Sequence, residues 1–215
     1  MDSGAAPPPH GEGPVETAGA ALDAASRAVV LVHGRGATAG SILTLHEELA
    51  VADTAYVAPG AAGRTWYPNS FLAPVASNEP GRSSGLGVIS AILEELSTAG
   101  IQPAETVLLG FSQGACLATE FAARHPRRYG GVVGLSGGLI GQEIDPSAYD
   151  GDLAGTPVFL GCSDRDPHIP APRVEQTGAI LDSLGGEVDQ RLYEGMGHTI
   201  NEDERSAVEA LIRAV

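Results

Sequence analysis

The chain has 215 residues, and its 27 acidic and 12 basic residues give a formal net charge of −15. So acidic a surface repels nucleic acids and anionic membranes, which excludes both as expected partners. No apolar run approaches the roughly 20 residues of a membrane span, and the first residues lack the basic and apolar regions of a signal peptide. These properties predict a cytoplasmic protein, and the length suits a single domain.

All 12 basic residues are arginine. An acidic composition without lysine resembles that of proteins from high-salt cytoplasm, where salt screens self-repulsion, and GC-rich coding is the alternative explanation. The two cysteines, Cys116 and Cys162, are too few for a disulfide framework and are not spaced as metal ligands. Both are therefore expected to be buried free thiols.

Residues 1–14 contain three consecutive prolines and three glycines, which predicts a flexible segment ahead of a domain over 15–215. In that domain, short apolar runs alternate with helical patterns. This alternation predicts an α/β fold: a mostly parallel central sheet with helices on both faces, in three layers. The expected strands are 15–18, 28–32, 54–58, 106–109, 131–135, 157–161 and 187–193. The expected helices are 40–50, 84–99, 113–124, 174–184 and 203–215.

The run over 28–32 ends in His33-Gly34-Arg35-Gly36, a glycine-rich loop after a buried strand. Hydrolases with a nucleophile elbow place an oxyanion-binding N–H in such a loop, and here it would belong to Arg35. His33 is expected to fix the loop by hydrogen bonds. A dinucleotide-binding loop is the rival interpretation, but the third glycine of that motif would fall at Ala39.

Two long loops are candidates for the walls of a binding site. The loop 59–80 contains Trp66 and Tyr67, and long loops at the carboxyl ends of strands commonly border active sites. Trp66 could equally fill the core. The loop 137–153 is polar and acidic from Glu143 onward but includes Leu139 and Ile140, which suggests a flap over the cleft. Trp66, Tyr67, Leu139 and Ile140 are the predicted substrate-binding residues.

Gly110-Phe111-Ser112-Gln113-Gly114 joins an apolar run to a helical pattern. Gly-x-Ser-x-Gly in this context is a nucleophile elbow, in which the serine stands at the tip of a sharp strand-to-helix turn. The N–H groups at the start of the following helix favour an oxyanion, so the N–H of Gln113 is the second expected donor. A structural turn with an incidental serine is the alternative.

A serine nucleophile needs a histidine base and a carboxylate that orients this base, and in this fold they follow in the order Ser, Asp, His. Asp166 and His198 each come after a predicted strand. Asp166 is preferred to Asp164 because Pro167 restricts it to an extended conformation. His168 is too close to Asp166 in sequence to act as the base. No spacing suggests a metal site, and no cofactor is expected.

These motifs together resemble the phospholipase/carboxylesterase family of α/β-hydrolases, which includes acyl-protein thioesterases. They are His33-Gly34-x-Gly36, Trp66-Tyr67, Gly110-Phe111-Ser112-Gln113-Gly114, Ser136-Gly137-Gly138, Gly161-x-x-Asp164-x-Asp166-Pro167 and Gly195-Met196-Gly197-His198. The resemblance runs from about Val29 to the last residue. It implies an α/β-hydrolase fold, and the analogy also suggests a homodimer.

The resemblance implies Ser112 as nucleophile, His198 as base and Asp166 as the residue that orients it. It implies backbone oxyanion donors at Arg35 and Gln113, and a carboxylic ester or thioester as substrate. Thioesterases of the family usually have an apolar residue and an aspartate after the His-Gly pair, where this chain has Arg35-Gly36-Ala37-Thr38. That departure favours esters of small molecules. The alternatives are an acyl thioesterase or lysophospholipase, and a non-hydrolytic protein on the same scaffold.

Overall fold

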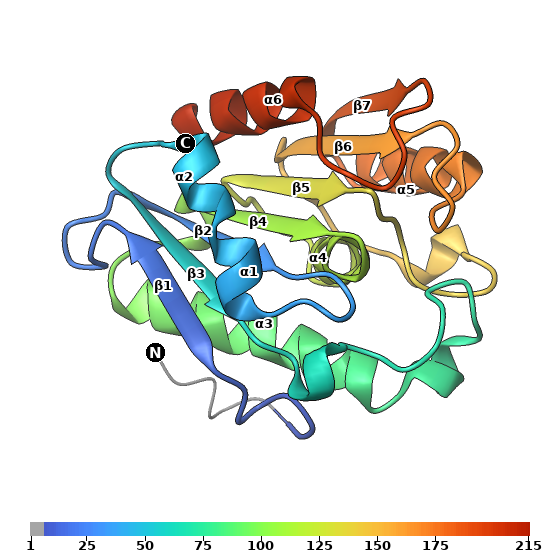
Figure 1. Cartoon of the computed structure of the whole chain (residues 1–215), viewed down its shortest axis with the longest axis horizontal. Helices are drawn as coiled ribbons and strands as arrows, with labels where there is room; N and C mark the ends of the chain where they lie inside the picture. Colours follow the sequence, from blue (N-terminus) through green and yellow to red (C-terminus); the bar gives the residue numbers. More distant parts are fainter. Residues whose placement is uncertain (1–6) are drawn as a thin grey trace.

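The computed structural model describes residues 7–215 and centres on a seven-stranded sheet (Figure 1). The strands are β1 (Val15–Gly19), β2 (Arg27–Val32), β3 (Thr54–Pro59), β4 (Thr106–Phe111), β5 (Gly131–Leu135), β6 (Pro157–Ser163) and β7 (Glu187–Tyr193). Their spatial order is β1-β3-β2-β4-β5-β6-β7. Only β1 runs antiparallel to its neighbour, so the predicted mostly parallel sheet is confirmed.

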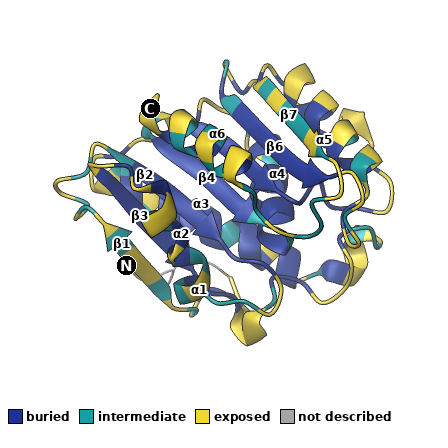
Figure 2. Ribbon diagram, turned by 45° about the horizontal axis from the view of Figure 1, so that its top comes forward, coloured by how far each residue is buried: buried dark blue, intermediate teal, exposed yellow. Residues whose placement is uncertain are grey.

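Six α-helices of the described chain cover the two faces of this sheet. They are α1 (Ala39–Leu43), α2 (Leu45–Leu49), α3 (Gly81–Thr98), α4 (Gln113–Arg124), α5 (Ala171–Ser183) and α6 (Glu202–Arg213). Short 3₁₀ helices occur at η1 (Ala62–Arg64), η2 (Val75–Asn78), η3 (Pro103–Glu105) and η4 (Pro146–Ala148). Helices α3, α4 and α5 cover one face and α1, α2 and α6 the other (Figures 1 and 2). The fold is thus the three-layer arrangement expected from the alternating pattern.

The central strands are buried on both sides because helices cover both faces, as Figure 2 shows. Side chains alternate along a strand, so Val30 and Leu108 pack in the core under α3–α5, whereas Leu31 and Leu109 pack in the core under α1, α2 and α6. Continuous apolar runs, rather than alternating ones, are typical of such strands.

The register aligns the carboxyl ends of the middle strands. Val32 of β2 lies opposite Gly110 of β4, and Gly110 lies opposite Gly134 of β5. The loops that follow these strands therefore start at one edge of the sheet, where open α/β sheets bind their ligands.

The prediction of a single helix over 40–50 was wrong. The helix expected over 40–50 is two short helices that meet at Thr44, whose hydroxyl donates to the carbonyl of Ser41 (2.9 Å). The flexibility expected over 1–14 stays a prediction, but the described part of this segment contacts α3: the Ser84 hydroxyl donates to the Pro7 carbonyl (2.6 Å) and the His10 amide to the Ser84 hydroxyl (2.9 Å). Residues 1–6 lie outside the described part.

The His10 side chain explains why this segment is held. Its ring is almost fully buried, accepts a hydrogen bond from the Ala62 amide at Nδ1 (3.1 Å) and donates from Nε2 to the Trp66 carbonyl (2.9 Å). Burial lowers the pKa of His10 more than the backbone contacts with Trp66 and Gly81 raise it. A neutral imidazole can act as donor and acceptor at once, so it links the amino-terminal segment to the loop 59–80.

Candidate active site

Ser112 stands at the turn between β4 and α4 with φ of 56° and ψ of −120°. A positive φ is uncommon for a residue other than glycine and marks a strained turn. The turn is held by the Ser112 amide, which donates to the carbonyl of Leu135 (2.9 Å). Close packing leaves room only for glycine on either side: a Cβ on Gly110 would collide with the backbone of Gly114, and one on Gly114 with the carbonyl of Val32.

Three side chains from distant segments form one hydrogen-bonded chain. His198 Nε2 lies 2.9 Å from Ser112 Oγ, and His198 Nδ1 lies 2.7 Å from Asp166 Oδ2. The Asp166 side chain is fully buried and the His198 side chain is 20% exposed. The structure therefore brings the three predicted residues together in the geometry of a serine–histidine–aspartate triad.

The environment of Asp166 favours its charged form. Burial alone would raise the pKa of Asp166, but hydrogen bonds from His198 and from the amides of His168 and Ile169 outweigh it and lower the pKa. A carboxylate can only accept, so the proton between the two groups is on His198 Nδ1. Nε2 is then free to accept the hydroxyl proton of Ser112.

Asp164, the alternative candidate for the carboxylate that orients His198, contacts the turn before His198. Its Oδ1 accepts a hydrogen bond from the Gly195 amide (2.8 Å), while the neighbouring Ser163 hydroxyl accepts one from the Gly197 amide (3.2 Å). Both glycines have positive φ, 62° and 79°. Asp164 and Ser163 thus hold the turn that carries His198.

The loop after β2 passes beside the serine. A Cβ added to Gly34 would lie 3.3 Å from Ser112 Cβ, which puts the Gly34–Arg35 segment next to the nucleophile. His33 is fully buried, and its Nε2 accepts from the Ala61 amide (3.0 Å) while Nδ1 donates to the Gly34 carbonyl (2.7 Å). His33 therefore fixes the loop by hydrogen bonds, as its position suggested.

A cavity of about 580 Å³ opens at Ser112. Its lining comprises Arg35, Tyr67, Pro68, Asn69, Ser70, Phe71, Ser112, Gln113, Cys116, His168, Ile169 and His198. Of the four predicted substrate-binding residues, only Tyr67 belongs to this set. Phe71, Cys116, His168 and Ile169 were missed, because no local pattern distinguishes them from core or surface positions.

Trp66, Leu139 and Ile140 are core residues in the structure, each with at most 1% of its surface exposed. The Trp66 indole donates to the carbonyl of His33 (2.9 Å), which turns the ring into the protein. The prediction that these three residues form the substrate pocket is therefore wrong.

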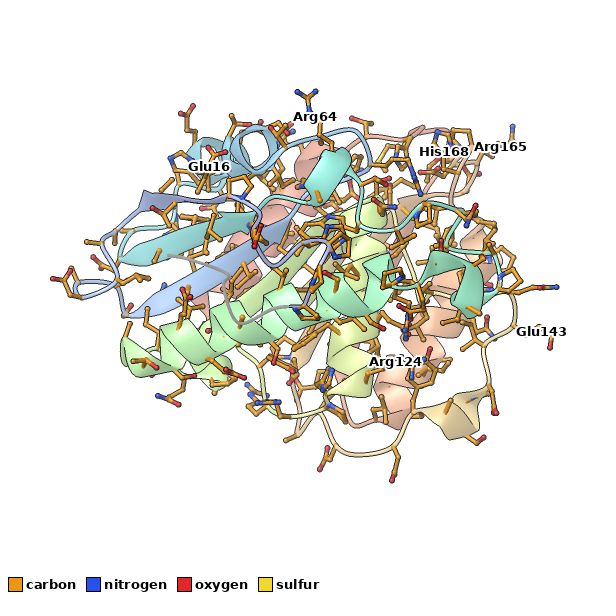
Figure 3. The ribbon with its side chains drawn as sticks, turned by 90° about the horizontal axis from the view of Figure 1, so that it is seen from below. Glu16, Arg64, Arg124, Glu143, Arg165 and His168 are labelled. Carbon is orange, nitrogen blue, oxygen red and sulfur yellow. The ribbon has the colours of Figure 1, made fainter. Side chains whose placement is uncertain are left out.

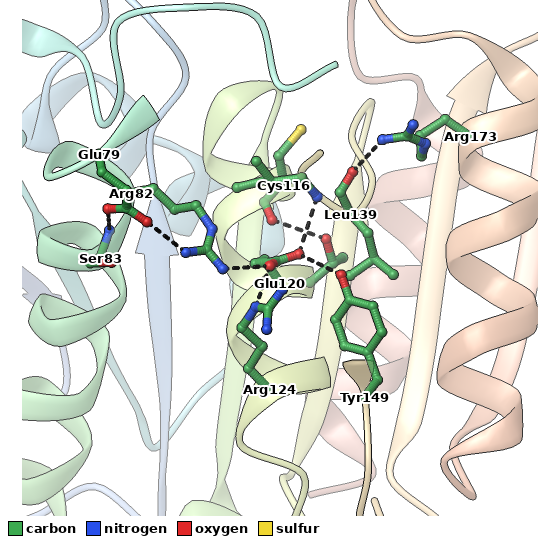
Figure 4. A network of polar contacts seen from close by, with 11 residues as sticks. Glu79, Arg82, Ser83, Cys116, Glu120, Arg124, Leu139, Tyr149 and Arg173 are labelled. Atoms are coloured by element: carbon green, nitrogen blue, oxygen red, sulfur yellow. Dashed lines mark hydrogen bonds and ion pairs between the residues drawn. The ribbon is translucent and has the colours of Figure 1, made fainter. Parts of the chain in front are cut away.

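The start of the loop 137–153 is tied to helices beneath it, so the flap that its composition suggested does not extend to this part. Glu120 of α4 accepts from the amide of Ile140 (3.1 Å), and the Arg173 guanidinium donates to the carbonyls of Leu139 and Gly141, each at 2.8 Å. Figure 4 shows this network. The buried polar groups anchor the backbone of the loop to α4 and α5.

His168 is exposed at the edge of the cavity, and its ring meets that of His198 edge to face, with centroids 5.0 Å apart. The nearly buried Cys116 also lines the cavity, and burial raises the pKa of its thiol to about 11. Cys116 is therefore a neutral thiol near pH 7. Both cysteines are free and buried, as predicted.

No helix within residues 7–215 is long and apolar enough to cross a membrane. Within the same residues, His, Cys, Asp and Glu side chains form no group of three that could hold a metal ion.

The parallel sheet, the elbow between β4 and α4 and the order of the three polar residues define the α/β-hydrolase fold. Residues 17–215 match the phospholipase/carboxylesterase family, and the chain belongs to it. A solved phospholipase/carboxylesterase from Dyadobacter fermentans is 40% identical, with a TM-score of 0.90 over 94% of this chain and 96% of that one. The predicted family and fold are thus confirmed.

Two relatives named acyl-protein thioesterase 1 also match. The protein from Gibberella zeae is 31% identical over 57% of this chain, and the protein from Kluyveromyces lactis is 32% identical over 63%. The matches span 53% and 61% of the length of those two relatives.

Proposed function

We propose that the protein is a serine carboxylesterase that hydrolyses esters of small molecules through an acyl-enzyme. The observation that carries the proposal is the hydrogen-bonded chain from Ser112 through His198 to Asp166. A serine hydroxyl is a weak nucleophile, and this arrangement activates it. The match to the phospholipase/carboxylesterase family supports the same chemistry.

In the proposed mechanism, His198 Nε2 takes the proton of Ser112 as Oγ attacks the ester carbonyl. The backbone N–H groups of Arg35 and Gln113 stabilise the oxyanion, and the buried carboxylate of Asp166 stabilises the imidazolium. His198 then protonates the departing alcohol. A water molecule attacks the acyl-enzyme by the same steps and releases the acid.

The cavity limits the substrates that fit. Its volume of about 580 Å³ lies within the range that holds small organic ligands. Phe71, Tyr67 and Ile169 supply apolar surface for an acyl group, while His168 and Asn69 are polar. We infer a preference for short or medium acyl chains. An acyl thioesterase is the second candidate, supported by the relatives of that name. A cytoplasmic location and a homodimer also stay predictions.

The test is hydrolysis of p-nitrophenyl esters from acetyl to palmitoyl, with an acyl thioester measured in parallel. Ser112→Ala should lower kcat by at least about 1,000-fold, because the loss of a triad member removes several kcal/mol of transition-state stabilisation. Ser183→Ala, on α5 and outside the cavity lining, is the matched control and should leave kcat unchanged. Full activity in Ser112→Ala would refute the assignment, and a thioester cleaved faster than every ester would favour the second candidate.

A further inference from the structure

The guanidinium of Arg35 donates four hydrogen bonds to the loop 59–80. Nη1 donates to the Thr65 hydroxyl (2.9 Å) and the Pro68 carbonyl (3.0 Å), while Nη2 donates to the carbonyls of Tyr67 (2.9 Å) and Asn69 (2.6 Å). Four acceptors from one five-residue segment thus surround one side chain. A planar guanidinium can satisfy them together, whereas a lysine ammonium presents its donors at a single point.

Gln113 holds the same segment from the other side. Its Oε1 accepts from the Trp66 amide (2.9 Å), and its Nε2 donates to the Tyr67 carbonyl (2.8 Å). The Tyr67 carbonyl therefore receives hydrogen bonds from both Arg35 and Gln113. These are the two residues whose backbone N–H groups we assign to the oxyanion.

The segment they hold is also a wall of the cavity, because Tyr67, Pro68 and Asn69 all line it. A backbone hydrogen bond also joins the loop after β2 to the loop 59–80, because the Gly36 amide donates to the Arg64 carbonyl (2.7 Å). Gly36 has φ of +79°, so this bend suits glycine. The loop after β2 and the loop 59–80 are thus joined at the site.

We propose that Arg35 is a positioning residue, whose side chain locks the wall 65–69 to the loop after β2 that carries the Arg35 N–H. The inference rests on the proposed function. By anchoring its own residue to the wall, the side chain keeps the Arg35 N–H in place. Its four Nη hydrogen bonds are made with protein oxygens, so it does not serve as a binding site for an anionic substrate.

Such a role predicts a loss in kcat rather than in substrate affinity, since a small displacement of a group that stabilises the transition state is costly. In Arg35→Met, kcat should fall by roughly 10- to 100-fold while KM changes by less than about 3-fold. Arg35→Lys keeps the charge but cannot reach all four acceptors, and its kcat should lie near that of Arg35→Met.

The matched control is Arg64→Met, which removes the same charge from the neighbouring loop. The exposed Arg64 side chain extends away from the protein (Figure 3), so this variant should keep the wild-type kcat. Kinetics are measured with neutral p-nitrophenyl butyrate and with an anionic p-nitrophenyl hemisuccinate. Amide hydrogen exchange over residues 64–71 is followed in the same variants, and it should accelerate in Arg35→Met and Arg35→Lys only.

Two results would overturn the proposal. Unchanged kcat and unchanged exchange in Arg35→Met would show that the lock is dispensable. A rise in KM for the anionic ester alone, reversed in Arg35→Lys, would show that Arg35 binds substrate charge. The exchange measurement does not depend on the reaction, and Ser112→Ala reports separately on the serine mechanism. Failure of the proposed function is therefore distinguishable from failure of this inference.

Discussion

Glu120 offers a quantitative test of how the protein is held together beneath the site. Its carboxylate is fully buried on α4 and pairs with the guanidinium groups of Arg82 (2.9 Å) and Arg124 (2.5 Å). It also accepts from the Ile140 amide (3.1 Å) and the Tyr149 hydroxyl (3.2 Å). Replacing it by leucine removes all four contacts at once (Figure 4).

The expected loss of unfolding free energy follows from the groups that Glu120→Leu leaves without a partner. The Arg82 side chain is only 8% exposed and would keep Glu79 as its partner, so the cost is near the lower end of the roughly 3–5 kcal/mol for breaking a buried ion pair. The unpaired Ile140 amide adds about 1 kcal/mol. Glu120→Leu should therefore lose about 4 kcal/mol of unfolding free energy and about 8–16 °C in Tm.

Urea unfolding followed by circular dichroism measures this loss. Glu94→Leu, the same replacement at an exposed position of α3, is the control and should change stability by less than about 0.5 kcal/mol. The double variant Arg82→Met/Glu120→Leu removes both charges of one pair, so it should lose less stability than the sum of the losses in Arg82→Met and Glu120→Leu. A Glu120→Leu variant as stable as the control, or a double variant in which the two losses add, would refute the reasoning.

Two further predictions concern pH and salt. Burial raises the pKa of Glu204 to about 7 from 4.5, despite the hydrogen bond from the Asn201 amide. Between these values the folded protein keeps a proton that the unfolded chain has lost, so stability falls as pH rises. Glu204→Gln should remove this slope, and urea midpoints at about pH 5 and about pH 8 measure it; a slope equal to that of the wild type would contradict the assignment. Molar potassium chloride should raise both Tm and esterase activity, because it screens the net charge of −15. Melting curves and initial rates across a salt series check this, and flat or falling curves would exclude a high-salt adaptation.

The sheet and the elbow were predictable because their signals are local. Each buried strand is an apolar run, and Gly110, Ser112 and Gly114 lie within five residues, where steric needs of one turn select the residue types. The order of Ser112, Asp166 and His198 along the chain follows from the fold once the strands are known, since parallel strands end at one edge. A sequence pattern could therefore predict that these three side chains lie together at that edge, where the structure has them within hydrogen-bonding distance.

The contacts of Trp66, Leu139 and Arg35 were decided by tertiary structure. Trp66 meets the carbonyl of His33 across 33 positions, Arg173 holds Leu139 across 34, and Arg35 reaches Asn69 across 34. Helical and strand periodicities report which face of an element is buried, but they carry no information on which distant loop supplies an acceptor. Whether an aromatic ring lines a cavity or fills the core depends on such contacts, because a buried N–H must find a partner wherever the fold provides one.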